Sequence, residues 1–184
     1  MTDHDDEATA RDDATDRMTR RVLWSLPTGL YLLAGGDLRQ GPKNANVMTV
    51  NLVTQVATTP RVLAVACEQT SVTLDFIRQS GQLALSILDR EDRAVVRKFV
   101  KPVAEGLVEI DGALTMAGQS VIVGETGLPH LASSVSWIEA RVVGYQEFES
   151  HALVLAEVAR VGERDGADQA QILRMEDTRM NYGG

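Results

Sequence analysis

The sequence predicts a mainly β protein with flanking helices. Two β-branched, apolar runs, Asn46 to Gln55 and Arg61 to Cys67, are separated by Thr-Thr-Pro, which is typical of strands joined by a short turn. A third run of this kind, Gln82 to Leu88, follows a segment with helical spacing. The chain from residue 44 to residue 88 is therefore predicted to form strand, strand, helix and strand, and the remaining elements are expected to complete its sheet.

The N-terminal segment is expected to be a disordered acidic tail. It covers residues 1–19, and Met1 to Asp16 is rich in Asp, Thr and Ala without apolar periodicity. Residues 20–184 are expected to form the single domain. A short helix over Arg17 to Leu26 is predicted at this boundary, and Pro27 ends it.

A first strand and a loop lead into this central unit. Leu30 to Leu33 is an apolar run, and Gly36-Asp37 supplies turn residues after it. The loop Gly41-Pro42-Lys43 follows. Lys43 is either a solvated loop lysine or a contact to a phosphate or a substrate.

Polar side chains interrupt the first strand of the central unit. Thr49, Asn51 and Thr54 lie among Val, Met and Leu residues. Because buried polar groups need hydrogen-bond partners, some of these side chains are expected to face a ligand or water rather than a dry core.

A helix is expected over Ser71 to Ser80, with Gly81 ending it in a left-handed conformation. Thr70, Ser71 and Thr73 gather at its start, where hydroxyls and free backbone N–H groups meet the positive end of the helix dipole. An anion such as phosphate suits this place. The alternative is that Thr70 or Ser71 serves only as the helix N-cap.

The middle of the chain is less regular. A helix is expected over Asp89 to Phe99, because Asp89 can cap it and acidic and basic residues match the dipole at its two ends. Pro102 follows this helix. The stretch from Val103 to Gly127 is rich in loops, with one short strand at Val121 to Val123.

Two long strands, Ser134 to Gln146 and His151 to Val161, are expected to finish the sheet. Their alternation predicts one apolar face, while the other face can pair charges or meet a second subunit. As an isolated residue, His151 is either a structural or a functional histidine. The tail after Gly166 is expected to pack against the body.

Composition narrows the classes of function. The chain has 184 residues, 44% hydrophobic and 24% charged, and its apolar runs are shorter than the ~20 residues of a membrane helix. A net charge of −8 disfavours nucleic acid and anionic membranes as partners. The single cysteine, Cys67, excludes an internal disulfide, and no metal site is expected, at His4 or elsewhere. Without a signal peptide, the expected location is the cytoplasm.

Three blocks of sequence, in order, carry a resemblance to a known family. The first block is Asn46-Val47-Met48-Thr49-Val50-Asn51, followed by Pro60 and Ser71-Val72-Thr73. The second block is Gly127-Leu128-Pro129 with Leu131, then Trp137-Ile138-Glu139. The third block is Ser150-His151-Ala152-Leu153. On these blocks the chain from Arg20 to Tyr182 resembles the flavin-reductase-like family of FMN-binding split barrels.

The resemblance implies an antiparallel Greek-key split β-barrel that binds FMN, or alternatively FAD, with NADH or NADPH as co-substrate. It implies a homodimer with the flavin site at or near the subunit interface, and a monooxygenase as a further partner. His151 would lie on the nicotinamide or acceptor side as the candidate catalytic residue. The residues expected to contact the flavin are Asn46, Thr49, Val50, Asn51, Thr54, Gln55, Cys67, Ser71 and Thr73.

Departures from the family pattern leave two hypotheses open. Arg61 replaces a second proline, Ala140 replaces the usual cysteine, and Glu149-Ser150 replaces Gly-Asp before His151. The first hypothesis is an FMN-dependent oxidoreductase that takes hydride from NADH or NADPH onto the flavin and passes electrons to free flavin, oxygen, ferric iron or a partner oxygenase. The second is a split-barrel protein that binds flavin or another cofactor without nicotinamide turnover, which the altered residues before His151 favour.

Overall fold

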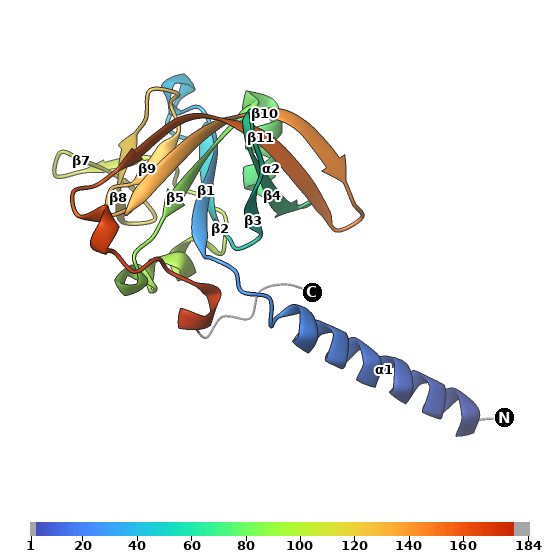
Figure 1. The fold of residues 1–184 in the computed structure, drawn as a ribbon. Coiled ribbons are helices and arrows are strands. Elements are labelled where there is room, and N and C mark those ends of the chain that lie inside the picture. Colours follow the sequence, from blue (N-terminus) through green and yellow to red (C-terminus); the bar gives the residue numbers. More distant parts are fainter. Residues whose placement is uncertain (1–2, 179–184) are drawn as a thin grey trace.

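The protein is built from antiparallel strands with two α-helices in its described part (Figure 1). The computed structural model describes residues 3–178, with side chains from residue 13 onward. The helices are α1 (Asp3–Leu23) and α2 (Val72–Ser80). The strands are β1 (Tyr31–Gly36), β2 (Ala45–Val50), β3 (Val53–Thr58), β4 (Arg61–Glu68), β5 (Gln82–Ile87), β6 (Val108–Ile110), β7 (Ala113–Met116), β8 (Gln119–Val123), β9 (Pro129–Leu131), β10 (Ser136–Glu147) and β11 (His151–Glu163). The 3-10 helices are η1 (Leu38–Gln40), η2 (Arg90–Asp92), η3 (Val95–Phe99), η4 (Ala167–Gln169) and η5 (Met175–Asp177).

The main sheet is curled, so that the end of one edge strand lies close to the start of the other. Seven strands follow the order β2-β1-β5-β10-β11-β4-β3, and its edge strands β2 and β3 are separated in sequence only by Asn51 and Leu52. In a flat sheet of this size the edges would lie about 29 Å apart. The three residue steps from Val50 to Val53 span at most about 11 Å. The Asn51–Leu52 link therefore keeps the two edges close to each other at this point.

Both faces of this sheet carry an apolar core. Successive residues of a strand point to opposite faces, so Leu32 lies in one core and Leu33 in the other. Helix α2 closes the second core through Leu74 and Ile77, both fully buried. The first core is closed by η3, the small sheet and the C-terminal segment, which contribute Phe99, Met116, Leu131 and Leu173.

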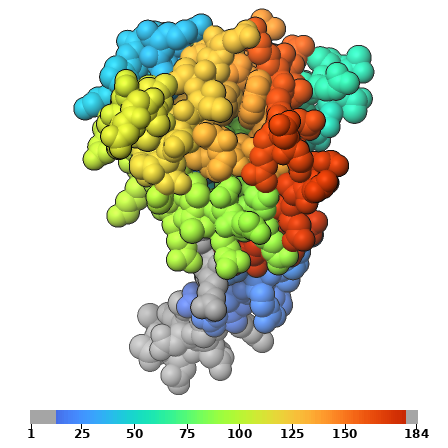
Figure 2. All heavy atoms as spheres, turned by 90° about the vertical axis from the view of Figure 1, so that its left-hand side faces the viewer, coloured from blue at the N-terminus to red at the C-terminus, as the bar shows by residue number. Residues whose placement is uncertain are grey.

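A smaller antiparallel sheet of β6, β7, β8 and β9 covers one side of the body. Figure 2 looks onto this side and shows the small sheet beside the segment that carries η1. The backbone N–H of Leu38 donates to the carbonyl of Gly127 at 2.8 Å, and the Arg39 guanidinium donates to the carbonyl of Glu125 at 3.1 Å. These hydrogen bonds fix the loop after β8 against the loop after β1.

Most of the expected elements are present. The predicted strands 61–67 and 82–88 correspond to β4 and β5, and the two long strands correspond to β10 and β11. The long strands pair with each other along their length, with two register shifts. Helix α2 ends at Gly81 with φ 68°, in the left-handed conformation that was predicted. Leu173 is fully buried, which confirms that the described part of the C-terminal tail packs on the body; Met180 to Gly184 lie outside the described residues.

The predicted strand 46–55 is wrong, because the chain breaks it into β2 and β3. At the break, the carbonyl of Asn51 accepts from the N–H of Val53 at 3.1 Å, which is the hydrogen bond of a three-residue turn. The carbonyl of Leu52 accepts from Ala66 of β4 at 3.0 Å. A period-2 pattern of apolar residues does not reveal which edge of the sheet each half joins.

The predicted helix 89–99 is also wrong as an α-helix. Two 3-10 helices, η2 and η3, occupy this stretch. Asp89 does cap η2, accepting a hydrogen bond from the N–H of Glu91 at 3.2 Å. In η3 the two buried side chains are Val96 and Phe99, three residues apart, which is the spacing that a 3-10 helix places on one face.

The N-terminal helix is longer than the sequence predicts. It spans Asp3–Leu23 rather than Arg17 to Leu26, so it crosses the boundary expected at residue 19. Figure 1 shows it projecting from the body, and its described side chains are exposed. An ion pair of 2.6 Å between Arg20 and Asp16, four residues apart, supports it. The division into a tail of residues 1–19 and a domain of residues 20–184 stays a prediction. The side chain of His4 is not among those that the structure describes.

Candidate functional site

A groove of about 690 Å³ lies beside the Asn51–Leu52 link. Its walls come from β2, the end of β4, the first turn of α2, the segment 100–102 and the start of β11. It gathers His151 and six of the residues expected at the flavin, namely Asn46, Thr49, Val50, Asn51, Ser71 and Thr73. Residues far apart in the sequence therefore share one cavity.

The first turn of α2 forms one wall of the groove. Ser71 is the N-cap: its Oγ accepts from the N–H of Leu74 at 3.2 Å, which confirms that it caps the helix. The same hydroxyl lies 3.0 Å from Sδ of Met48 in β2. Helix geometry leaves the N–H groups of Val72 and Thr73 without intrahelical acceptors. Capping and anion binding are therefore compatible at this helix start.

The buried polar side chains of β2 find their partners within the protein. Thr49 Oγ1 donates to the carbonyl of Val96 in η3 at 2.6 Å. Asn46 Nδ2 donates to the carbonyl of Val103 at 3.2 Å, and Asn46 Oδ1 accepts from Thr73 Oγ1 at 3.3 Å. The expectation that polar residues of this strand need a ligand or water is thus wrong for Thr49, because η3 supplies the acceptor.

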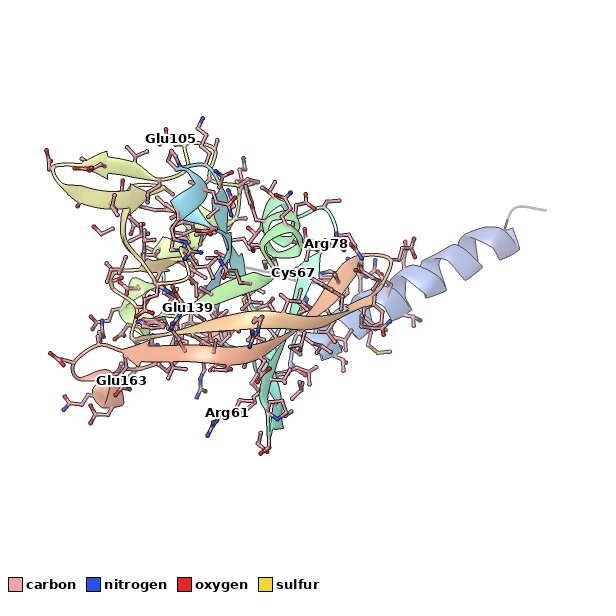
Figure 3. The ribbon with its side chains drawn as sticks, turned by 90° about the horizontal axis from the view of Figure 1, so that it is seen from above. Arg61, Cys67, Arg78, Glu105, Glu139 and Glu163 are labelled. Atoms are coloured by element: carbon pink, nitrogen blue, oxygen red, sulfur yellow. The ribbon has the colours of Figure 1, made fainter. Side chains whose placement is uncertain are left out.

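Three residues expected at the flavin lie outside the groove. Thr54 and Gln55 are exposed on β3, and the Gln55 amide donates to the carbonyl of Ala57 at 2.9 Å. Cys67 is 1% exposed and belongs to the core beneath α2. Figure 3 shows it inside the body, beneath the helix that carries Arg78. Their assignment to the flavin stays a prediction without support from this groove.

His151 stands at the first position of β11, opposite Glu68 of β4 in the strand register. Its Nδ1 lies 3.0 Å from Oγ of Ser150, and its carbonyl accepts from the Gln69 side chain at 3.3 Å. The Gln69 amide also donates to Glu147 at 2.6 Å. These contacts hold the turn between β10 and β11, and the half-buried His151 lines the groove.

The segment 100–102 forms another wall of the groove. The sequence did not predict it as part of the site. Lys101 is the single lysine or arginine among the described residues that line the groove. Lys43, which the sequence offered as a phosphate contact, is exposed and outside it. In the sequence, Lys101 stands out only as a basic residue between the predicted helix 89–99 and Pro102, which does not indicate a role at the site.

A second polar cluster is buried away from the groove. His130 Nε2 and Glu139 Oε1 lie 2.9 Å apart, with side chains 3% and 1% exposed. Arg160 approaches Glu139 Oε2 to 3.9 Å. A Cβ on Gly124 would come within 2.0 Å of Glu139 Oε1, so only glycine leaves room for this pair. The alternation of β10 placed Glu139 on a face available for charge pairing but did not reveal its burial.

Fold and groove together define a class of protein, an antiparallel β protein with a cofactor-sized groove at the link between its sheet edges. The volume of about 690 Å³ lies within the roughly 300 to 1,000 Å³ typical of small-molecule and cofactor sites. Met48, Val50 and Leu52 give apolar surface for a flat ring. The N-terminus of α2 and Lys101 supply positive charge for an anionic group.

The chain belongs to the flavin reductase like family. The model of the "Flavin reductase like domain" matches residues 23–183, which confirms the resemblance read from the sequence. A "Probable flavin reductase" of Rhizobium meliloti is 22% identical over 142 residues, which are 77% of this chain. The match covers 42% of that relative, so the chain spans less than half of its length.

Solved structures share the fold. An NADH:FAD oxidoreductase of Streptomyces globisporus, in complex with NAD and FAD fragments, has a TM-score of 0.72 at 21% identity, covering 92% of this chain and 94% of that one. The flavin reductase of the styrene monooxygenase from Pseudomonas putida has a TM-score of 0.69 at 21% identity, covering 87% and 93%. A flavin reductase component of a bacterial tryptophan halogenase has a TM-score of 0.66 at 17% identity, covering 86% and 98%.

Within the described residues, neither helix combines the length and the apolar character needed to cross a membrane. The same part of the chain contains no group of three or more His, Cys, Asp or Glu side chains placed to hold a metal ion.

Proposed function

We propose that the protein is an FMN-dependent oxidoreductase that takes hydride from NADH or NADPH and passes electrons to free flavin, oxygen, ferric iron or a partner oxygenase. The observation that carries this proposal is the groove, which brings together His151 and the six residues that the family resemblance assigns to the flavin. We further propose that the curled sheet is a Greek-key split barrel. The proposed location of the protein is the cytoplasm. FAD is the alternative flavin.

The residues of the groove fit a flavin. A bound flavin supplies the hydride-accepting ring, so the protein needs little acid or base of its own. Met48, Val50 and Leu52 offer apolar contacts to the ring, and the first turn of α2 offers backbone N–H groups to a phosphate. The segment 100–102 lines the groove as well and adds the charge of Lys101 to it.

Similar proteins support an oxygenase partner. The structures that this chain resembles include the flavin reductase of a styrene monooxygenase and the flavin reductase component of a two-component halogenase. In such pairs, as their names state, the reductase serves a second protein. We infer the same arrangement here, with a monooxygenase as the partner.

FMN should bind to the purified protein in a calorimetric titration at tens of micromolar. Replacing Ser71 and Thr73 together by alanine should weaken binding by roughly 1 to 3 kcal/mol, because the hydroxyls that cap and position the first turn of α2 are lost. Thr58→Ala, at an exposed position outside the groove, is the matched control and should bind as the unmodified protein does. Absence of FMN binding by the unmodified protein would contradict the proposal.

His151→Ala should lower turnover while FMN affinity stays within about a factor of ten, that is ~1.4 kcal/mol, if the imidazole orients the nicotinamide or the acceptor. The rate of NADH or NADPH oxidation, measured beside an FMN titration, checks this. Ser150→Ala is the control, because it removes the 3.0 Å contact at Nδ1 and keeps the ring. Unchanged oxidation in His151→Ala would return His151 to a structural role.

The alternative is a flavin-binding protein without nicotinamide turnover. Ser150, which stands where the family has aspartate, is in contact with the histidine at the groove and favours this alternative. Absorbance spectra of the FMN complex before and after addition of NADH or NADPH under argon separate the two. Bleaching of the flavin band supports the oxidoreductase, and an unchanged spectrum supports the binding protein.

The working unit should be a homodimer with the flavin site at or near the interface. The long strands and the turn between them carry exposed apolar side chains, with Val143 at 54%, Phe148 at 57% and Val161 at 66% exposure. Burying them against a two-fold partner would stabilise the pair, and FMN bound near the interface should raise both the melting temperature and the dimer affinity. Light scattering checks the mass with and without FMN. A monomer that is saturated with FMN and active at tens of micromolar would exclude this arrangement.

A further inference from the structure

One buried amide joins the two walls of the groove. Asn46 Nδ2 donates to the carbonyl of Val103, just beyond the segment 100–102, at 3.2 Å. Asn46 Oδ1 accepts at 3.3 Å from Thr73 Oγ1 in the first turn of α2. Asn46 is 4% exposed and Thr73 is 1% exposed. The Thr73 hydroxyl is therefore directed at Asn46 and not at solvent, and the amide links two segments that are 30 residues apart in sequence.

Both walls that Asn46 joins carry positive charge. On one side, the first turn of α2 presents the N–H groups of Val72 and Thr73 at the positive end of the helix dipole. On the other side stands Lys101. An anionic group between the walls interacts with both only when their separation is right, because electrostatic attraction falls with distance.

We propose that Asn46 is a positioning residue, which sets the separation of the two walls and thereby the preference of the groove for a flavin that carries a phosphate. This inference rests on the proposed function and adds to it the residue that determines phosphate selectivity. Asn46 acts through Thr73 on the helix and through Val103 on the Lys101 segment. It does so without contacting the reacting ring.

A comparison of FMN with riboflavin, which lacks the phosphate, tests this role. Asn46→Ala should lower the affinity for FMN about tenfold and leave the affinity for riboflavin within about threefold, because only the anionic end depends on both walls. Lys101→Gln should show the same pattern as Asn46→Ala, with a lower affinity for FMN and little change in the affinity for riboflavin. Asn44→Ala, at an exposed asparagine outside the groove, is the matched control and should change neither.

A second variant removes the other end of the bridge. Thr73→Val keeps the shape of the buried side chain but loses the donor to Asn46, and Thr73→Ser restores a hydroxyl. If the two residues act through each other, Asn46→Ala combined with Thr73→Val should be no worse for FMN than the more damaging single variant. Additive losses would instead mean that Thr73 contacts the phosphate independently, and would overturn the positioning role.

The outcomes separate the inference from the proposed function. Equal losses for FMN and riboflavin, in either the Asn46 or the Thr73 variant, would show a purely structural residue and overturn the inference alone. Failure of the unmodified protein to bind either ligand would overturn the proposed function, and the inference with it. A melting temperature measured for every variant identifies those that fail to fold, and Thr73→Val then carries the test if Asn46→Ala does not fold.

Discussion

Glu139→Ala should lower the free energy of unfolding by about 1 to 3 kcal/mol, the usual cost of leaving a buried hydrogen-bonding group without its partner. The carboxylate lies 2.9 Å from His130 Nε2, and both side chains are buried. Removing it leaves the histidine nitrogen without its partner and opens a cavity beside Gly124. Denaturant unfolding followed by fluorescence measures the change.

Glu163→Ala is the matched control for this experiment. Glu163 is a glutamate at the end of the other long strand, β11, and it is exposed. Figure 3 shows the two residues on neighbouring strands, Glu139 near the small sheet and Glu163 at the end of β11. The control should change stability by less than about 0.5 kcal/mol. Similar losses for both variants would contradict a special role for the buried pair.

Cys67 should resist alkylation in the folded protein. Burial raises the pKa of the Cys67 thiol from its ordinary value of 9.0 to about 12. Because the thiolate is the reactive form, its fraction at pH 8 falls about a thousandfold, and the 1% exposure of the residue limits access further. Iodoacetamide labelling followed by mass spectrometry should show modification only after unfolding in denaturant. Rapid labelling at pH 8 without denaturant would contradict this burial.

Local pattern was enough to predict most elements of the fold. The apolar runs of β4, β5, β10 and β11 and the helical spacing of α2 each depend on neighbours in sequence, which is why they could be found without the structure. The turn at Asn51–Leu52 could not be found in this way. It depends on two halves of one apolar run pairing with β1 and β4, which occupy opposite sides of the sheet.

Only part of the candidate site could be predicted, because local motifs reveal some of its residues and tertiary packing brings in the others. Asn46, Ser71 and His151 were identified because they stand in motifs that the family resemblance supplies, and the groove contains all of them. Lys101 was missed, because only tertiary packing brings the segment after η3 against β2. The burial of Glu139 was missed because its partner His130 comes from a strand of only three residues.

The Asn51–Leu52 link joins both edges of the main sheet at the groove, so a ligand bound there is expected to stabilise both edge strands. Edge strands have one neighbour instead of two, so their amide hydrogens exchange with solvent more readily than those of central strands. Here the two edges, β2 and β3, flank the link, and the groove lies beside it. A ligand seated there would slow amide exchange in β2, β3 and the first turn of α2 together. Occupancy of the groove could thus be measured at the backbone amides of β3, a strand that does not line the groove.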